Sequence, residues 1–489
     1  MARQIRPASG IPAGVRAALV LGLPMLGSIS VVCIYLNKEI LVAAAWVALG
    51  MAALVFVEPL IGIGAMTAMF VLVAYPTLLA DLGFLTINNL LGLCLAVVFV
   101  GRIMTTRDLS VFRLRTVLLF VLIGAVFVIS TLHVPVAFPT LRVSQGIGIK
   151  GNDLDRTAYM MHDFWVRLGY IVLFAFFVRG GRDVRAMFYV FALVLFLAVP
   201  SALINWWNGE LSHGFRTEAS LTAGSNPNRL AMICLMEIAC WRCWAVARGG
   251  AVRAWIAVAA MGGALLVVLA SGSRSGLLGC AVLGVLLQTG PRRYRFSALQ
   301  VAMLAVAGVI AIAAVVPPEA WERALAFNAE DRHSGSTMSI VAREQTLETG
   351  IQMVRDHPLL GVGLGNFREV SRQIYFDPFF RPPHNSPMWA VTQGGVFAFA
   401  GYVFIFWFLW RDIQTASRLV DRDPACAWVT VATRHVFLLF SFFSLFADLW
   451  LNPITYVLIG TIICLRRHLE RLPPVLAAGR PAPALARAA

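Results

Sequence analysis

The stretch that decides the fold is residues 254–289, AWIAVAAMGGALLVVLASGSRSGLLGCAVLGVLLQT. It contains two apolar runs, 254–271 and 275–289, and a single charged residue, Arg274, in the turn between them. Only a segment that satisfies its own backbone hydrogen bonds is stable in hydrocarbon, so apolar runs of this kind indicate membrane-spanning helices. The stretch therefore predicts two antiparallel membrane helices joined at Arg274.

The same pattern runs through all 489 residues. Hydrophobic residues make up 59% of the chain, charged residues only 13%, and the mean hydropathy is +0.78. A soluble domain is about 45–50% apolar and about 25% charged, which excludes a soluble enzyme, a disordered protein and a secreted disulfide scaffold. We expect an all-α, polytopic membrane protein with about 12–14 transmembrane helices and one large periplasmic loop. The apolar runs predict fourteen spans, at 17–36, 40–57, 60–80, 84–101, 116–133, 164–178, 184–204, 230–246, 254–271, 275–289, 297–316, 388–410, 427–447 and 452–465.

Charge sets the predicted orientation. The net charge is +15, and all basic residues except two lysines are arginines, many of them in short clusters between apolar runs. Such clusters indicate cytoplasmic loops of a membrane protein and do not form a basic face for nucleic acid. With fourteen spans every cluster falls on one side, so both termini are expected in the cytoplasm. The opposite, outer side receives the long loops 134–163, 205–229 and 317–387.

Four regions follow from this topology. A first part of the transmembrane bundle covers 1–316, with about eleven helices, and a large periplasmic loop domain covers 317–387. The last part of the bundle covers 388–466, with about three helices, and 467–489 is expected to be a disordered cytoplasmic tail because it is rich in Pro, Ala and Arg. Within the loop, residues 339–356 have the apolar spacing of an amphipathic helix.

The sequence predicts neither a metal nor a cofactor. All eight cysteines lie in or beside apolar runs, so no disulfide framework is implied. Cys240 and Cys243 form a lone CxxC that fits two small apolar residues of a span better than a zinc site. The glycine-rich turn GVGLGNF at 361–367 satisfies neither GxGxxG nor GxxxxGK and is not expected to bind a nucleotide.

Arginines on the outer side are the first candidates for chemistry. Arg274 has no acidic residue in either flanking run, and an arginine at membrane depth costs about 2.5–3.5 kcal/mol, so an anionic ligand is favoured over a simple turn. Arg216 is a second candidate for binding an anionic ligand, and a surface ion pair with Glu218 or Glu210 has equal weight. Arg343 is a third candidate, and a solvated position on the loop helix has equal weight for it. Asn228 is expected to cap the helix that follows it.

His384 is the best candidate for proton transfer. It lies in PPHNSP, 382–387, where three prolines stiffen the entrance to a span. A histidine with an ordinary pKa of about 6.5 suits a general base, and Asn385 beside it is a candidate for binding substrate.

The order of these motifs resembles a known family. An outer-loop arginine precedes NPNRLA, followed by SGSRSGLLG, an amphipathic helix, DHPLLGVGLGNF and HNSPMWAVTQGGVFAFAGY. From about 213 to 402 this resembles the O-antigen ligase/polymerase superfamily of bacterial membrane glycosyltransferases, although about twelve spans are more usual there.

The resemblance implies a reaction and its participants. Such proteins lie in the bacterial inner membrane, take a glycan from undecaprenyl pyrophosphate at the periplasmic face and join it to an acceptor sugar hydroxyl, for example on lipid A-core, with inversion and without a metal. Transferred by motif, Arg274 and Arg216 bind the pyrophosphate, His384 activates or orients the acceptor hydroxyl, and Arg343 matches a loop-helix arginine.

Two alternatives stay open at this point. A polymerase for O-antigen or exopolysaccharide of the same superfamily shares the chemistry and differs only in its acceptor. A polysaccharide or lipid transporter is compatible with fourteen spans, but the sequence shows neither internal repeats nor the midplane polar residues typical of transporters.

Overall fold

The computed structural model describes residues 50, 52–72, 87–138, 156–209, 226–297, 299–300, 306, 335–379 and 381–473. Eight helices in these ranges are long and apolar enough to cross a membrane, which confirms the expected all-α, polytopic membrane protein. The main helices are α3 (Pro59–Val71), α5 (Ile87–Thr106), α6 (Arg115–Ala137), α7 (Arg156–Phe177), α8 (Gly181–Phe196), α9 (Ala198–Trp207), α10 (Pro227–Arg248), α11 (Ala251–Ala270), α12 (Arg274–Thr289), α15 (Gly335–Asp356), α16 (Phe367–Gln373), α17 (Ser386–Arg418), α18 (Ala427–Phe443) and α19 (Pro453–Arg471). The span expected at 17–36, most of those at 40–57 and 297–316, and Arg216 lie outside the described residues.

Every predicted span that lies within the described residues coincides with a helix. The span at 184–204 is divided into α8 and α9 by Leu197. Pro200 accounts for the break, because it has no N–H to donate to the preceding turn and its ring crowds the carbonyl there. The two pieces together still form a candidate span of 27 residues, Gly181–Trp207.

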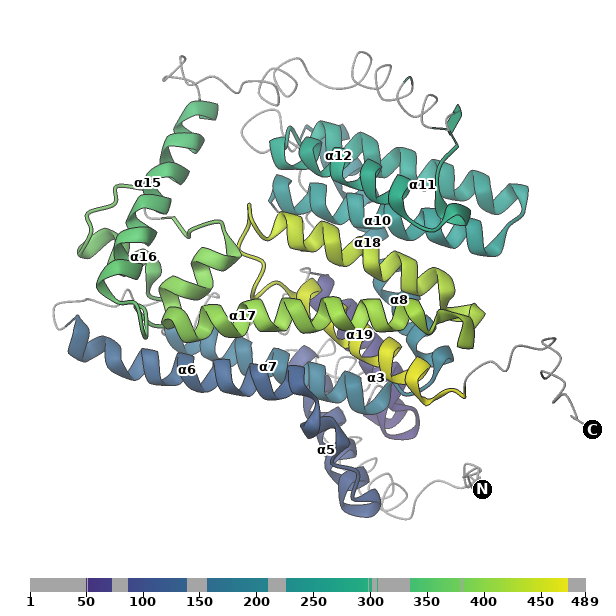
Figure 1. Ribbon diagram of the computed structural model, residues 1–489, viewed down its shortest axis with the longest axis horizontal. Coiled ribbons are helices and arrows are strands. Elements are labelled where there is room, and N and C mark those ends of the chain that lie inside the picture. The colour runs from purple at the N-terminus through teal and green to yellow at the C-terminus, as the bar shows by residue number, and fades with distance from the viewer. Residues whose placement is uncertain are drawn as a thin grey trace, which may run out of the picture.

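The helices pack in one bundle, with α10, α11, α12 and α18 on one side and α6, α7, α17 and α19 on the other (Figure 1). α10 lies against α11, α12 and α18, and most of its side chains are buried. α17 packs against α6 and α19, and α19 in turn contacts α7 and α8. Every side chain of α10 from Leu230 to Cys240 is buried, whereas α6 and α11 expose apolar side chains, among them Leu122 and Trp255, as helices that face lipid do.

The arginine clusters come together at one end of the bundle. Here Arg466, at the end of α19, pairs with the buried Asp412 near the end of α17 at 2.6 Å, and Arg115 at the start of α6 pairs with the same carboxylate. Arg179, after α7, pairs with Asp108, between α5 and α6, at 3.0 Å. The clusters therefore join neighbouring helix ends, as expected if all of them belong to the same side of a membrane.

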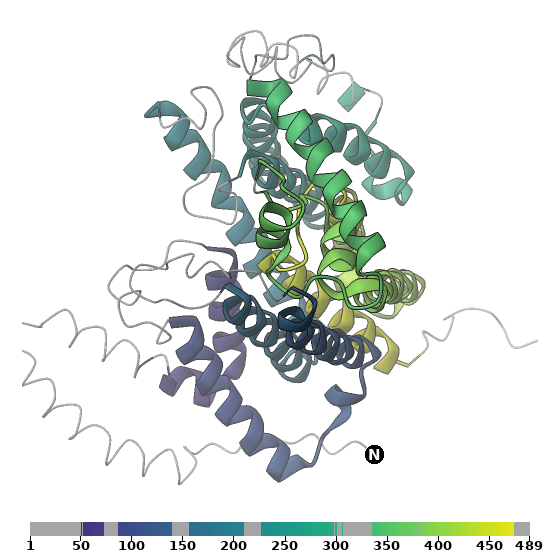
Figure 2. The same ribbon diagram turned by 90° about the vertical axis from the view of Figure 1, so that its left-hand side faces the viewer.

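The other end of the bundle carries α15 and α16, which cross the ends of the spanning helices (Figure 2). The expected amphipathic helix at 339–356 is α15. The segment from Pro358 to Asn366, between α15 and α16, fits into a kink of α17, where Gly394 and Gly395 leave helical geometry. The Val362 N–H donates to the Thr392 carbonyl at 2.7 Å, and the Val396 N–H donates to the Pro358 carbonyl at 2.8 Å.

Glycine is required on both sides of this contact. A Cβ on Gly361 would lie 2.3 Å from the Thr392 oxygen, and a Cβ on Gly395 would lie 1.9 Å from the Leu359 oxygen. Both glycines also have positive φ, 64° and 65°, which residues with a side chain rarely adopt. The glycine-rich turn at 361–367 therefore has a structural role, because it fixes the loop domain to the membrane helix that begins at Ser386.

Candidate functional site

The N-termini of α10 and α12 are joined by a hydrogen bond at the end of the bundle that carries α15 and α16. Asn226 caps α10 by accepting a hydrogen bond from the Asn228 N–H at 2.9 Å, and Ser273 caps α12 by accepting one from the Gly276 N–H at 3.1 Å. The prediction that Asn228 is the cap is wrong, because the proline at 227 takes the first helical position and leaves the cap to the residue before it. The Asn228 side chain instead accepts a hydrogen bond from the Ser273 hydroxyl at 2.7 Å.

Arg274 is the first residue of α12, directly after this link. Its side chain is half-buried. The neighbouring Ser271, Ser273 and Ser275 are buried and bonded to the protein itself, Ser271 to the Val268 carbonyl at 2.6 Å. The serines shape the turn, and the guanidinium is the part of SGSRSG that can reach a ligand at the helix start.

His384 is held at the same end by the residues that follow it. Asn385 caps α17 by accepting a hydrogen bond from the Met388 N–H at 2.8 Å, and its Nδ2 donates to the Leu445 carbonyl at 3.1 Å. The Ser386 hydroxyl donates to the Ala447 carbonyl at 2.8 Å and accepts from the Leu449 N–H at 2.8 Å. These bonds connect the start of α17 to the turn between α18 and α19.

That connection places Asp448 beside His384. Asp448 lies in the turn that Ser386 binds, and its carboxylate forms an ion pair with Arg229 of α10 at 3.1 Å. Arg229 is the residue after Asn228, so contacts lead from Arg274 through Ser273 and α10 to Asp448 and His384. Arg274 and His384 therefore lie at the same end of the bundle, linked through the start of α10.

The charges around His384 set its protonation state. Burial lowers the pKa of His384 to about 4, the carboxylate of Asp448 opposes this shift, and the guanidinium groups of Arg343, Arg229 and Arg381 add to it. At neutral pH the imidazole is consequently neutral and has a free lone pair to accept a proton. A neutral imidazole can accept a proton, and the arginines around it can attract an anion.

The sequence predicted part of this arrangement. Arg274, His384, Arg343 and Asn385 all lie at this end, while Arg216 falls outside the described residues. Both polar groups of Asn385 already have partners within the protein, so it contributes by fixing the turn that carries His384.

Three members of the site were missed by sequence analysis. They are Asp448, Arg229 and Arg368, the last of which interacts electrostatically with Asp448. A signal was present for one of them, since Asp448 is the only acid in the short connection 444–452 between two apolar runs. The sequence does not show that Asp448 lies near His384, because only the fold brings that turn to the starts of α10 and α17.

The arrangement combines a neutral base, a carboxylate and several guanidinium groups at the border of an apolar bundle. Guanidinium groups bind phosphate oxygens bidentately and keep their charge. A neutral histidine beside them can take a proton from a hydroxyl. Such a site is suited to a reaction in which a hydroxyl attacks a centre whose leaving group is a phosphate.

Part of the chain matches a known family. A search of curated proteins with the whole chain gives no match. Residues 256–403 match a family described as O-antigen ligase, a stretch that includes Arg274, α15, His384 and the kink of α17. The resemblance inferred from the motif order is thereby confirmed: residues 256–403 match the O-antigen ligase family, and this match supports the O-antigen ligase/polymerase superfamily.

Proposed function

We propose that this protein transfers a glycan from undecaprenyl pyrophosphate to a sugar hydroxyl of an acceptor at the periplasmic face of the inner membrane, as an O-antigen ligase does. The observation that carries the proposal is the position of His384 between Asp448 and three arginines, at the same bundle end as Arg274. The family match supports lipid-linked glycan and acceptor sugar as the two substrates in general terms.

The reaction follows from these groups. The acceptor hydroxyl gives its proton to His384 while its oxygen attacks the anomeric carbon of the glycan, and the bond from that carbon to the pyrophosphate oxygen breaks. The electron pair of that bond leaves with the pyrophosphate, so negative charge grows on the lipid carrier. Arg274 is the residue we assign to that charge, together with Arg216, which stays a prediction from the sequence. Attack from the side opposite the leaving group inverts the anomeric centre without a covalent enzyme intermediate.

Arg343 and Asp448 are assigned supporting roles around His384 and Arg274. Arg343 of α15 contributes positive charge near His384 and is assigned to the glycan pyrophosphate as it enters. Asp448 is assigned a positioning role, since it neutralises part of the arginine charge and orients Arg229. Removing one contact to developing charge typically costs about 2.7–4 kcal/mol, or about 10²–10³ in rate; loss of a general base costs about 10²–10⁴.

Replacement of Arg274 and His384 tests the proposal. Full-length Arg274→Ala and His384→Ala proteins, purified and reconstituted with an undecaprenyl pyrophosphate-linked glycan and an acceptor, should lose transfer by these factors while inserting and accumulating normally. Arg248→Ala, at the arginine-rich end of α10, is the matched control and should keep full activity. Wild-type rates in Arg274→Ala would refute the pyrophosphate role.

The same reconstitution separates ligase from polymerase. A single glycan added once to lipid A-core on a gel indicates ligase activity, whereas a ladder of repeats on the carrier indicates the polymerase of the same superfamily. We place the ligase first because residues 256–403 match the O-antigen ligase family. Transfer that persists after exhaustive chelation would support the metal-free reaction, and loss restored by one divalent ion would overturn it.

A further inference from the structure

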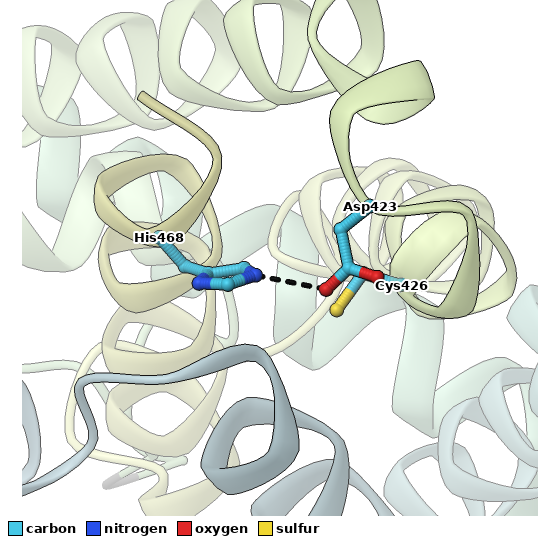
Figure 3. Close-up of side chains that lie close together, drawn as sticks. All are labelled: Asp423, Cys426 and His468. Atoms are coloured by element: carbon cyan, nitrogen blue, oxygen red, sulfur yellow. Dashed lines mark hydrogen bonds and ion pairs between the residues drawn. The ribbon is translucent and has the colours of Figure 1, made fainter. Parts of the chain in front are cut away.

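A second cluster of reactive side chains lies at the arginine-rich end of the bundle, remote from His384. Its members are Asp423 and Cys426, in the connection between α17 and α18, and His468 in the last turn of α19 (Figure 3). The carboxylate oxygen, the thiol sulfur and the imidazole nitrogen all lie within 4.8 Å of one another. α18 and α19 run from this end to the other, since the turn between them carries Asp448, so the two clusters occupy opposite ends of the bundle.

Local structure explains why the first two side chains point the same way. Asp423 caps the short 3₁₀ helix Pro424–Cys426 by accepting a hydrogen bond from the Ala425 N–H at 3.1 Å with Oδ1. Residues three apart eclipse each other in 3₁₀ geometry, so Cys426 lies beside Asp423. The other oxygen, Oδ2, is turned to His468 Nε2 at 2.8 Å.

The first residue of α8 is a glycine, Gly181, and it lies directly against these atoms. A Cβ on Gly181 would lie 2.5 Å from Asp423 Oδ2 and 2.5 Å from His468 Nε2. Glycine at this position therefore allows the carboxylate and the imidazole to meet near the Cys426 sulfur, which lies 3.7 Å from the Gly181 carbonyl oxygen.

We propose that Asp423, Cys426 and His468 bind a zinc ion that joins the start of α18 to the end of α19, beside the start of α8. Zinc favours sulfur, imidazole and carboxylate ligands in tetrahedral sites, at about 2.3, 2.0–2.1 and 2.0–2.2 Å, with water free to take a fourth position. Tetrahedral bonds of that length separate the ligand nitrogen and oxygen by about 3.3 Å. The 2.8 Å contact between His468 and Asp423 thus has to open by only a few tenths of an ångström.

The charges are compatible with this ion. Binding releases the Cys426 proton, after which the thiolate and the Asp423 carboxylate together balance Zn²⁺ while His468 is neutral. Arg185 of α8 lies 3.4 Å from Asp423 Oδ2 and 3.5 Å from Cys426 Sγ. Arg185 is a quarter exposed, so it can yield Oδ2 to the metal and keep its hydrogen bond to the sulfur, where it supports the ligand from the second layer.

Cobalt substitution tests the site by a signal that only a thiolate ligand gives. Full-length protein in detergent, freed of metal, should bind one Co²⁺ per chain with a thiolate-to-cobalt charge-transfer band and tetrahedral d–d bands, and Zn²⁺ should displace it. Cys426→Ser should abolish the charge-transfer band. Cys280→Ser, a free cysteine of α12, is the matched control and should leave it unchanged.

Gly181→Ala provides a variant that retains all three ligands. The added methyl group occupies the space between Asp423 and His468, so Co²⁺ affinity should fall about tenfold or more. Zinc should also raise the melting temperature of the wild type and not that of Cys426→Ser. Absence of the charge-transfer band, a band that survives in Cys426→Ser, or equal affinity in Gly181→Ala would overturn the proposal. None of these readouts depends on glycan transfer, so the zinc site and the proposed function fail independently.

Discussion

His384 has a backbone φ of 46°, in the left-handed region that is costly for any residue with a side chain. The following residues hold this conformation, because Asn385 and Ser386 bind the carbonyl groups of Leu445 and Ala447. Strain of this kind is concentrated at functional sites. It gives His384 a defined direction toward Asp448 and the arginines, which the stiff prolines before it suggested in the sequence.

Only some residues of the candidate site could be selected from the sequence. Arg274 and His384 could be selected because an unbalanced arginine and a histidine among prolines are unusual in an apolar chain. Asp448 and Arg229 could not be selected, because their place in the site depends on an ion pair between residues 219 positions apart. Asn228 was misassigned because two asparagines flank Pro227, and the cap is decided by which of them precedes the proline.

The pH dependence of transfer should depend on the charges around His384. Its pKa of about 4 means that the base is neutral across the physiological range, so kcat/KM should stay flat as pH falls and decline only near pH 4. Arg343→Gln removes a positive charge that lowers this pKa, so the acid limb should move to higher pH. Asp448→Asn removes a negative charge that raises it, so the limb should move to lower pH.

The ionic strength and a control variant provide two further checks of this pH dependence. Arg343 is exposed, and screening by salt limits its effect to less than about one pH unit; the shift should shrink further at high ionic strength. Arg248→Gln, at the far end of α10, should leave the profile where it is. Shifts of the same sign in Arg343→Gln and Asp448→Asn would show that another group controls the acid limb.

At the scale of elements, the apolar runs were enough to place the helices, since a membrane leaves the backbone few other choices. The breaks within them were not predicted. Pro200 divides one span, and the pair Gly394–Gly395 kinks α17 to receive the segment after α15. A glycine pair within an apolar run does not reveal whether another backbone will approach it, because that depends on a segment some thirty residues earlier.

Gly395→Ala should release the loop domain from α17. The new methyl group would meet the Leu359 carbonyl at 1.9 Å and would be forced into a left-handed conformation with φ of 65°. The conformation alone costs about 1–2 kcal/mol, and the clash adds to it. We expect a lower melting temperature in detergent and reduced glycan transfer, because α15 and the start of α17 carry the site.

Gly262→Ala is the matched control in α11, where nothing lies within 4 Å of the added group. Alanine is the better helix former by about 0.8–1.0 kcal/mol, so this variant should be unchanged or slightly more stable. Equal stability of the two variants would contradict the docking role of Gly395.

At the scale of the whole molecule, the two ends of the bundle differ in charge and in proposed role. One end is bound together by arginines, by the buried Asp412 and by the cluster of Asp423, Cys426 and His468. The other carries α15, α16 and the residues around His384. Arginine-rich short loops stay in the cytoplasm, so a bilayer placed around the bundle should put the site in the periplasm, where a lipid-linked glycan would meet its acceptor.

Cysteine labelling tests this orientation through one exposed position at each end. Glu348 on α15 and Arg418 at the end of α17 are both exposed, and their side chains take no part in the contacts described above. In intact cells a membrane-impermeant maleimide should label Glu348→Cys, and it should label Arg418→Cys only after the membrane is permeabilised. The unaltered protein, whose described cysteines are buried or half-buried, gives the background in each case. The reverse pattern would place His384 in the cytoplasm and remove the periplasmic reaction, whereas labelling of both positions in intact cells would contradict a bundle that crosses the membrane from one end to the other.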